Sequence, residues 1–157
     1  MENTTLILGD NCHVEEPAML GRTYLNWREP LRIGDHAIIR PYAVIYCDTT
    51  IGEHFQCGYF CVIRAECKLA DRVTLMSRVT LEGRVEIGEA TKIMAHVYLP
   101  SKTKIGSRVF IGPGVTVLND RYPFHRERSQ TVVQGPTIED SVMVGGGCTL
   151  FPGIRIG

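Results

Sequence analysis

Apolar residues recur at every sixth position over most of the chain. The repeat runs without a break from Ile33 to Val117. The residues of this first register are Ile33, Ile39, Ile45, Ile51, Cys57, Ile63, Leu69, Leu75, Leu81, Ile87, Ile93, Leu99, Ile105, Ile111 and Val117. A second register, four positions later, holds small or β-branched residues such as Ala37, Val73 and Val109. A period of six is a multiple of the two-residue period of a strand and not of 3.6, so the pattern predicts strands and excludes helices.

Glycine adds a longer period to the pattern. Gly34, Gly52, Gly88 and Gly106 each follow the first register and lie at multiples of 18 from one another, with Ala70 in the remaining slot. Each hexapeptide is expected to form a short strand, which suits β-branched residues, and a bend whose unusual φ suits glycine. Three strands then make one triangular coil, and coils stack at about 4.8 Å with parallel pairing. The pattern therefore predicts an all-β parallel helix whose interior is filled by the first register.

The repeat is interrupted once and is weaker near the N-terminus. Residues 118–137 are polar, aromatic and charged in their middle part, and the repeat resumes at Ile138. We expect this segment to be one protruding loop that replaces part of a coil. Upstream, the register is displaced by one residue within "RTYLNWREP". We predict a single domain over 1–157, with an irregular N-terminal coil 1–32, about seven coils and the loop excursion 118–137.

Composition and charge narrow the class of protein. Apolar residues make up 44% of the 157 residues, and 17 Lys and Arg balance 17 Asp and Glu. The balanced charge indicates neither a nucleic acid nor an anionic membrane as partner. There is no run of about 18 apolar residues, and the N-terminus lacks a basic region. We therefore expect no transmembrane helix and no signal peptide.

The six cysteines do not follow a metal-binding pattern. There is no CxxC pair and no Cys/His cluster at zinc spacing, so no metal is predicted. Cys57, Cys61, Cys67 and Cys148 fall at register positions assigned to the interior, where a free thiol behaves as a small hydrophobe. We expect reduced, structural cysteines in a cytoplasmic protein.

The repeat resembles that of the hexapeptide-repeat acyltransferases over about residues 30–157. The resemblance implies a left-handed parallel β-helix, a homotrimer, and an acyl group taken from acetyl-CoA or an acyl carrier protein. That handedness departs from the right-handed crossover rule and does not follow from the period. A narrower branch, which N-acetylates amino groups of nucleotide-linked sugars, is similar to "FQCGYFCVIRAE", "IGSRVFIGPGVTVLNDRYP" and "GPTIEDSVMVGGGCTLFPGIRIG". Membership would imply acetyl-CoA as co-substrate, a nucleotide-sugar as acceptor and no metal.

Asn119 is the first candidate for the chemistry. Acetyl transfer to an amine needs an unprotonated nitrogen held near the thioester, a proton acceptor and donors for the oxyanion. The resemblance implies that Asn119 contacts the amine, and its amide oxygen would accept an N–H bond and orient the lone pair. Asp120, Arg121 and Tyr122 follow it as candidates for binding the acceptor. The alternative is that Asn119 forms a turn with Asp120.

Two histidines are candidate bases. Sister branches that acetylate sugar hydroxyls carry a His-Pro-x-His loop, whose first His is the base. Tyr122 occupies that position here, and His125 matches the second His. This departure favours an amine acceptor, which is the better nucleophile. His96 follows Ile93 by three positions, so it should face outward, where a groove between subunits would include it as base or donor. Both histidines also suit a solvated surface.

Further candidates concern the ligands. Arg64 and Glu66 form an outward pair that suits a sugar or phosphate, or an interchain salt bridge, which we favour. The resemblance implies a CoA groove between coils of two subunits, in which backbone groups near Gly145, Gly146 and Gly147 contact the pantetheine arm. These glycines would otherwise serve tight corners.

Two rival functions share the predicted fold. The γ-type carbonic anhydrases contain a segment like "VIRAE", but their zinc needs three His. Here Ser101 takes the second slot after His96, and residues 69–81 contain no His. His36 and His54, 18 positions apart, are expected to stack as a surface pair. The other rival is a non-catalytic β-helical scaffold.

The scaffold hypothesis draws on the end of the sequence. The chain stops at Gly157 within a hexapeptide, which leaves an open last coil that invites association and part of the CoA groove missing. The long loop argues for catalysis, because a scaffold has little need to leave the stack. We therefore predict an acetyl-CoA-dependent N-acetyltransferase, with an O-acetyltransferase as a less favoured alternative.

Overall fold

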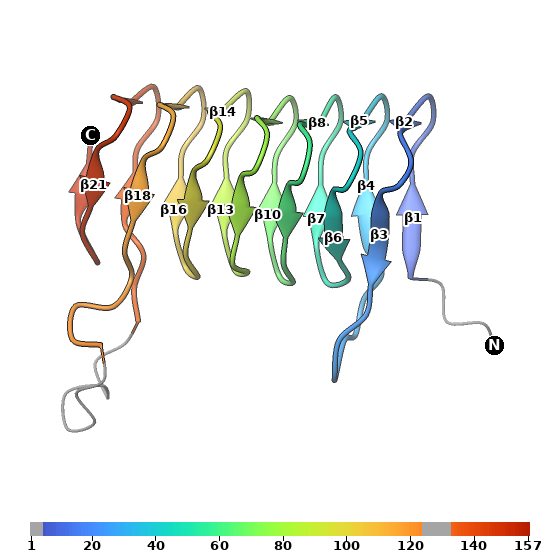
Figure 1. Ribbon diagram of the computed structural model, residues 1–157, viewed down its shortest axis with the longest axis horizontal. Helices are drawn as coiled ribbons and strands as arrows, with labels where there is room; N and C mark the ends of the chain where they lie inside the picture. The colour runs from blue at the N-terminus through green and yellow to red at the C-terminus, as the bar shows by residue number, and fades with distance from the viewer. Residues whose placement is uncertain (1–4, 124–132) are drawn as a thin grey trace.

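The computed structural model describes residues 5–123 and 133–157, in which short parallel strands form three sheets (Figure 1). The first sheet contains β1 (Leu6–Leu8), β4 (Leu31–Ile33), β7 (Thr50–Ile51), β10 (Lys68–Leu69), β13 (Glu86–Ile87), β16 (Lys104–Ile105), β19 (Thr137–Ile138) and β22 (Arg155–Ile156). The second contains β2 (His13–Val14), β5 (Ile38–Ile39), β8 (Gln56–Cys57), β11 (Thr74–Leu75), β14 (Lys92–Ile93), β17 (Phe110–Ile111) and β20 (Met143–Val144). The third contains β3 (Met19–Arg22), β6 (Val44–Tyr46), β9 (Val62–Ile63), β12 (Thr80–Leu81), β15 (Tyr98–Leu99), β18 (Thr116–Val117) and β21 (Thr149–Leu150).

Successive strands belong to successive sheets, so three strands make one coil. Strands of neighbouring coils pair at an offset of one repeat unit, as Leu69 does with Ile51 and Ile87. Within the described residues, the coils run from β1–β3 to β19–β21, and β22 starts the next. The fold is a left-handed parallel β-helix, and both the predicted fold class and the 18-residue unit are confirmed.

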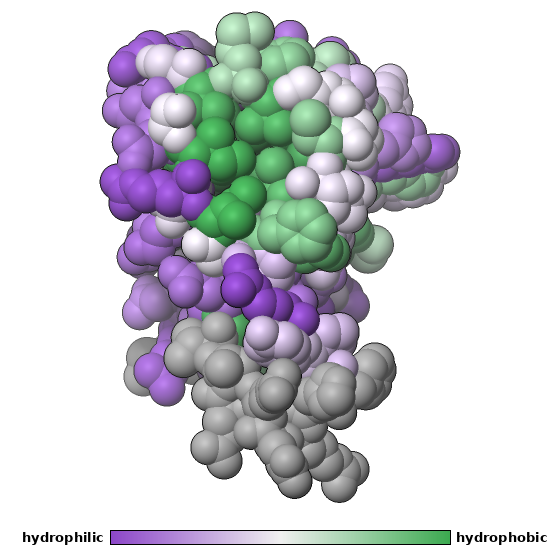
Figure 2. All heavy atoms as spheres, turned by 90° about the vertical axis from the view of Figure 1, so that its left-hand side faces the viewer, coloured by the Kyte–Doolittle hydropathy of each residue, from purple (hydrophilic) through white to green (hydrophobic). Residues whose placement is uncertain are grey.

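The two apolar registers form the interior. Ile63, Leu81 and Val79 have no exposed surface, and complete burial of such a side chain stabilises a fold by about 1.5–3 kcal/mol. Thr91 and Thr103 are buried in the second register, and their hydroxyls donate to the carbonyls of Gly106 (2.8 Å) and Pro100 (2.7 Å). Apolar side chains also gather on the end face that carries the last coil (Figure 2).

The backbone conformation at the corners shows that the repeated glycines have a different role from the one predicted. The left-handed backbone at each corner is supplied mostly by residues other than glycine, such as His36 (φ 59°) and Glu66 (φ 62°), three positions after the first register. Gly52 has no such φ, but a Cβ there would lie 2.7 Å from the backbone nitrogen of Asp71 in the next coil. The expectation that these glycines provide an unusual φ is wrong. They allow two coils to approach each other closely.

The burial of two cysteines differs from the prediction. The structure records free thiols at Cys12, Cys47, Cys57, Cys61, Cys67 and Cys148. Cys57, Cys61 and Cys67 are buried as expected, whereas Cys148 is exposed and Cys47, outside the predicted set, is buried. Cys148 keeps the second-register spacing, but it lies in the last described coil, where no further coil packs over it.

Two segments leave the stack. The strap, residues 23–30, joins β3 to β4, and the long excursion, residues 118–136, joins β18 to β19. Both therefore replace the same kind of corner, where the third sheet passes to the first, and the strap and the described ends of the excursion, 118–123 and 133–136, project from one side of the prism (Figure 1). The sequence predicted the second excursion but read the first only as a displaced register. Within residues 5–123 and 133–157, no helix has the length and apolar character needed to cross a membrane.

Candidate functional site

A ladder of charged residues runs along the corner between the third and first sheets, which we call the third corner. Asp48, Glu66, Arg84 and Lys102 occupy its left-handed positions in four successive coils, with φ between 53° and 66°. They repeat every 18 residues, so each lies about one strand spacing, 4.8 Å, from the next. Since a corner residue points outward, the repeat turns one position of the sequence into a line of charge.

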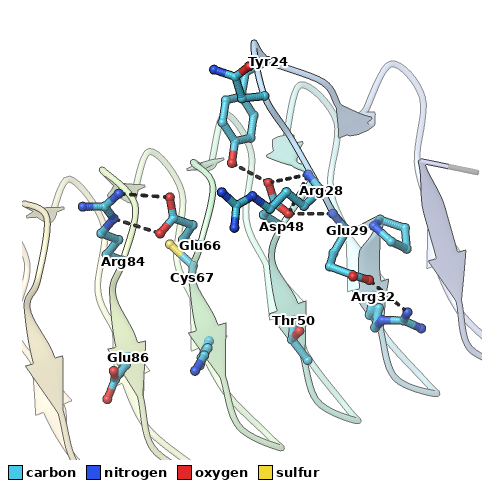
Figure 3. A pocket seen from close by; sticks show the side chains of 13 residues that line it. Tyr24, Arg28, Glu29, Arg32, Asp48, Thr50, Glu66, Cys67, Arg84 and Glu86 are labelled. Atoms are coloured by element: carbon cyan, nitrogen blue, oxygen red, sulfur yellow. Dashed lines mark hydrogen bonds and ion pairs between the residues drawn. The ribbon is translucent and has the colours of Figure 1, made fainter. Parts of the chain in front are cut away.

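The strap is held against this ladder by Asp48. The hydroxyl of Tyr24 donates to Oδ2 of Asp48, while the backbone amides of Glu29 and Arg28 donate to Oδ1 at 2.7 and 3.1 Å (Figure 3). The backbone amide of Asp48 in turn donates to the carbonyl of Glu29 at 2.9 Å. One carboxylate therefore joins both ends of the strap to the stack.

These contacts shift two pKa values in opposite directions. Desolvation raises the pKa of Asp48, but the hydrogen bonds from Tyr24 and from the amides of Glu29 and Arg28 outweigh it and hold that pKa below 3.8. Desolvation and the hydrogen bond to Asp48 raise the pKa of Tyr24 to about 12. At neutral pH the pair is an ionised carboxylate that accepts a bond from a protonated phenol.

The strap and the ladder enclose an open pocket of about 790 Å³ (Figure 3). It is lined by Tyr24, Asn26, Arg28, Glu29, Pro30, Arg32, Asp48, Thr50, Glu66, Cys67, Lys68, Arg84 and Glu86. We call it the strap pocket. A smaller pocket of about 370 Å³ is also lined by Tyr24, and Arg64, Glu82 and Ser101 are among its other lining residues. The two pockets share Tyr24, Glu66 and Arg84, so together they follow the third corner over several coils.

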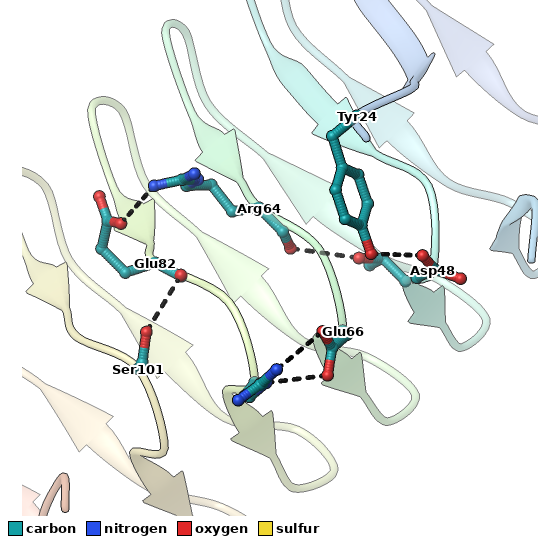
Figure 4. A network of polar contacts seen from close by, with 8 residues as sticks. Tyr24, Asp48, Arg64, Glu66, Glu82 and Ser101 are labelled. Atoms are coloured by element: carbon teal, nitrogen blue, oxygen red, sulfur yellow. Dashed lines mark hydrogen bonds and ion pairs between the residues drawn. The ribbon is translucent and has the colours of Figure 1, made fainter. Parts of the chain in front are cut away.

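Arg64 and Glu66 each pair with the next coil of the same chain rather than with each other. A guanidinium nitrogen of Arg64 lies 2.8 Å from a carboxylate oxygen of Glu82, and Nε of Arg84 lies 2.9 Å from a carboxylate oxygen of Glu66 (Figure 4). Both ion pairs lie within one chain, and the expected interchain bridge stays a prediction. Arg64 lines the smaller pocket, and its role in binding a substrate stays a prediction.

Asn119 stands at the root of the long excursion. Its Nδ2 donates to the carbonyl of Ser101 at 3.3 Å, and its own carbonyl accepts from the backbone amide of Gln134 at 3.1 Å. The hydroxyl of Ser101 donates to the carbonyl of Glu82 at 3.2 Å (Figure 4). Ser101 therefore connects Asn119 to the smaller pocket. Because Nδ2 is bound to the stack, the amide is oriented and Oδ1 is its remaining acceptor.

The residues after Asn119 form a turn. Oδ1 of Asp120 accepts from the backbone amide of Tyr122 at 2.8 Å, which is a side-chain turn typical of Asp. Arg121 is exposed and Tyr122 is partly buried. His125 lies outside the described residues. The turn assigns a structural role to Asp120, while the proposed contact of Asn119 with an acceptor stays a prediction.

His96 is exposed, as predicted, but it lies on the corner between the second and third sheets, which we call the second corner. There its backbone adopts φ 63° and its amide donates to the carbonyl of Ser77 at 3.2 Å. β15 separates this corner from the third. Within one chain, the structure therefore does not bring His96 together with Asn119.

Gly145, Gly146 and Gly147 follow β20 and lead into the same corner as His96. The amide of Gly147 (φ 71°) donates to the carbonyl of Pro113 at 2.9 Å. All three glycines are exposed, so their backbone is accessible to a ligand. The candidate base and the candidate CoA-binding glycines thus share the second corner.

Other predictions of side-chain placement can also be compared with the structure. His36 and His54 stack as expected, with ring centroids 4.8 Å apart and planes inclined by 10°. Among the residues the structure describes, no three His, Cys, Asp or Glu side chains are grouped so that they could hold a metal ion.

Sequence reasoning missed the strap pocket. Two signals pointed to it: the broken period within "RTYLNWREP", and the recurrence of charged residues 18 positions apart at Asp48, Glu66 and Arg84. Neither signal shows that the two segments meet. That contact depends on the path of the strap in three dimensions.

Comparison with known proteins is consistent with this fold. Residues 84–119 match the family model described as "Bacterial transferase hexapeptide (six repeats)". Two curated relatives are acyl-[acyl-carrier-protein]–UDP-N-acetylglucosamine O-acyltransferases. The protein from Ectopseudomonas mendocina is 31% identical over 108 residues, which cover 69% of this chain and 40% of the relative. The protein from Rickettsia canadensis is 37% identical over 91 residues, which cover 50% of this chain and 34% of the relative.

A solved structure supports the fold independently. The GDP-perosamine N-acetyl transferase from Caulobacter crescentus, solved as a point mutant in complex with CoA and GDP-perosamine, superimposes with a TM-score of 0.65 at 20% identity. That alignment covers 86% of this chain and 53% of the other. The chain spans less than half the length of the two curated relatives. In its repeat, its fold and these matches, the chain is similar to the hexapeptide-repeat transferases.

Proposed function

We propose that this chain is the β-helical part of an acetyltransferase that uses acetyl-CoA and N-acetylates an amino sugar linked to a nucleotide. The observation that carries the proposal is the third corner. An otherwise regular lattice leaves its path twice at this corner, and between the two excursions lies a line of charged residues and polar pockets that ends at Asn119. A purely structural β-helix has no need of such a line.

The comparisons support the ligand classes. The solved neighbour holds CoA and a nucleotide-sugar, and the curated relatives act on UDP-N-acetylglucosamine. Both kinds of protein transfer an acyl group to a nucleotide-linked sugar. The choice of an amine as acceptor rests on the loop, because Tyr122 replaces the His that a hydroxyl acceptor would need as a strong base.

The proposed reaction is direct attack by the neutral amine on the thioester. The amine lone pair forms the C–N bond, the tetrahedral intermediate collapses with loss of the CoA thiolate, and the amine proton passes to a base. Oδ1 of Asn119 accepts one N–H of the amine and directs the lone pair toward the carbonyl carbon. His96 or His125 takes the proton, and the CoA sulfur leaves with a net gain of one proton.

The placement of the candidates favours a site between two subunits of a homotrimer. Asn119 and the acceptor pockets lie on the third corner, whereas His96 and the glycines 145–147 lie on the second. Packing the third corner of one subunit beside the second corner of the next would unite an acceptor side with a donor side. A complete site would then require the oligomer.

One observation favours a second function. The two curated relatives described above, at 31% and 37% identity, are O-acyltransferases that use an acyl carrier protein. An O-acyltransferase would need a base strong enough for a hydroxyl, which Tyr122 cannot supply. We therefore rank this function second.

The decisive experiment measures thiol release from acetyl-CoA with UDP- and GDP-linked amino sugars, and with their 3- or 4-hydroxyl counterparts. We expect release only with the amino sugars. Release with the hydroxyl sugars instead would establish the O-acyltransferase. If no acceptor caused thiol release and titration of millimolar acetyl-CoA gave no heat, the non-catalytic scaffold would be the remaining function.

A further inference from the structure

In the strap pocket every carboxylate has a hydrogen-bond or ion-pair partner, but not every cationic side chain has one among the described residues. Four cations and four carboxylates line it, so its formal charge is zero. Each carboxylate, however, already has a donor. Glu29 pairs with Arg32 (3.5 Å), Glu66 with Arg84 (2.9 Å) and Glu86 with Lys104 (3.4 Å), while Asp48 accepts from Tyr24 and two backbone amides.

Arg28 and Lys68 remain without a carboxylate at ion-pair distance among the described residues. The backbone amide of Arg28 binds Asp48, which fixes the start of its side chain, and its guanidinium reaches past Asp48 toward Glu66 (Figure 3). Lys68 belongs to β10, on whose outer face its side chain is exposed, two coils beyond the strap. The pocket therefore presents two cations, one on the strap and one on the sheet, that make no ion pair within the described part of the chain, although Arg28 acts electrostatically on Asp48 and Lys68 lies opposite Glu86 on the neighbouring strand.

We propose that the strap pocket binds a diphosphate group, with Arg28 and Lys68 as its two clamping cations. The guanidinium of Arg28 provides a planar fork of donors for phosphate oxygens, and Lys68 adds a point charge from the opposite wall. Thr50 supplies a hydroxyl on the same wall. A monovalent carboxylate would meet only one of the two cations, so a diphosphate uses the pocket more fully.

The strap pocket is close enough to Asn119 for one ligand to reach both. Arg84, at one end of the pocket, and Asn119 are separated by two coil steps along the third corner, which is about 10 Å at ordinary strand spacing. The smaller pocket extends into that interval as far as Ser101, whose carbonyl accepts from Nδ2 of Asn119. A diphosphate held under the strap can thus extend its other substituent along the corner toward Asn119. This inference deepens the proposed function, since both a nucleotide-sugar and CoA contain a diphosphate.

The test uses Trp27, the single tryptophan, which lies in the strap and donates its backbone amide to the carbonyl of Tyr24. Inorganic pyrophosphate, UDP and CoA are titrated separately while Trp27 fluorescence and heat are recorded. Arg28→Gln and Lys68→Gln are compared with Lys92→Gln, which removes an exposed lysine from the equivalent position of β14 in the second sheet. Circular dichroism and the unfolding midpoint verify that each variant folds.

We expect pyrophosphate to bind, and each pocket variant to raise its Kd by about tenfold or more, as the loss of a charge-assisted hydrogen bond does. Lys92→Gln should leave Kd unchanged. Stronger binding of UDP than of CoA would assign the pocket to the acceptor, and the reverse to the donor; either result supports the proposal.

Two outcomes would overturn it: no binding of pyrophosphate, UDP or CoA to the folded wild-type chain, or equal Kd values in the pocket variants and Lys92→Gln. Neither result depends on catalysis. Thiol release that persists while Arg28→Gln and Lys68→Gln bind normally would reject the clamp but keep the transferase. Weakened binding in Arg28→Gln and Lys68→Gln, without thiol release by the wild-type chain, would keep the clamp but reject the transferase.

Discussion

At the scale of single residues, position within the hexapeptide decides what a side chain does. Ile63 and Val79 face the interior because they stand at register positions, and Glu66 faces outward because it stands at a corner. The glycine column shows a further constraint, since Gly52 is needed where Asp71 of the next coil approaches the backbone. A side chain at such a point is restricted by a neighbour in the next coil, and not by its own φ.

Gly52→Ala should destabilise the chain by about 1–3 kcal/mol, because the new Cβ would lie 2.7 Å from the backbone nitrogen of Asp71. Gly114→Ala is the matched control, since nothing lies within 4 Å of its Cβ position and its φ of 66° costs about 1 kcal/mol. Urea unfolding measures both. A smaller loss at Gly52 than at Gly114 would show that the coils can separate there without cost.

Asn119→Ala should lower kcat about tenfold to a hundredfold with an unchanged circular dichroism spectrum, because the amine would lose its orienting acceptor. Gln134→Ala removes another amide side chain from the base of the same excursion and should leave kcat unchanged. The measurement is thiol release under saturating acetyl-CoA. Normal kcat in Asn119→Ala would remove this residue from the site.

At the scale of elements, the strap depends on one carboxylate. Asp48 gathers donors from both ends of residues 23–30, and β3 and β4 hold those ends in place. The strap contributes little apolar surface to the interior, since Leu25 is 86% exposed. Its position therefore rests on polar contacts, which respond to pH.

The strap should loosen in acid. The pKa of Asp48 in the folded chain lies below the ordinary aspartate pKa of 3.8. Its hydrogen bonds therefore stabilise the strap at pH values above 3.8, and this stabilisation is lost as the pH falls through the pKa of the folded state. Trp27 fluorescence should report a transition below about pH 4, while far-ultraviolet circular dichroism is still native. Asp48→Asn should abolish that transition. The same acid transition in Asp48→Asn would assign it to another group.

At the scale of the whole molecule, stability is shared between neighbouring coils. Each strand pairs with the strands directly above and below, so a coil contacts few segments apart from its two neighbours. The loss of packing in a central coil should therefore weaken its interfaces on both sides. Sites along a corner also combine residues from successive coils, as the strap pocket does.

Leu81→Ala should cost about 2–5 kcal/mol, since this side chain has no exposed surface and its removal leaves a cavity in a central coil. Leu25→Ala, in the exposed part of the strap, should change stability by less than about 0.5 kcal/mol. Denaturant unfolding compares the two. Similar losses at both positions would mean that the interior collapses around the missing side chain.

The hexapeptide period was enough to predict the strands, the 18-residue coil, the interior residues and the long excursion, because in a β-helix each coil repeats the same local pairing. Handedness came from the resemblance and not from the period. The sequence could also place Asn119 and His96 outside the interior. It could not show that these two residues occupy different corners, that Arg64 and Glu66 each pair with the next coil, or that Cys148 is exposed. Those facts depend on which coil lies beside which. The strap pocket required the tertiary structure above all, because Tyr24 and Arg28 reach Asp48, Glu66 and Arg84 only when an irregular segment folds back over a regular stack.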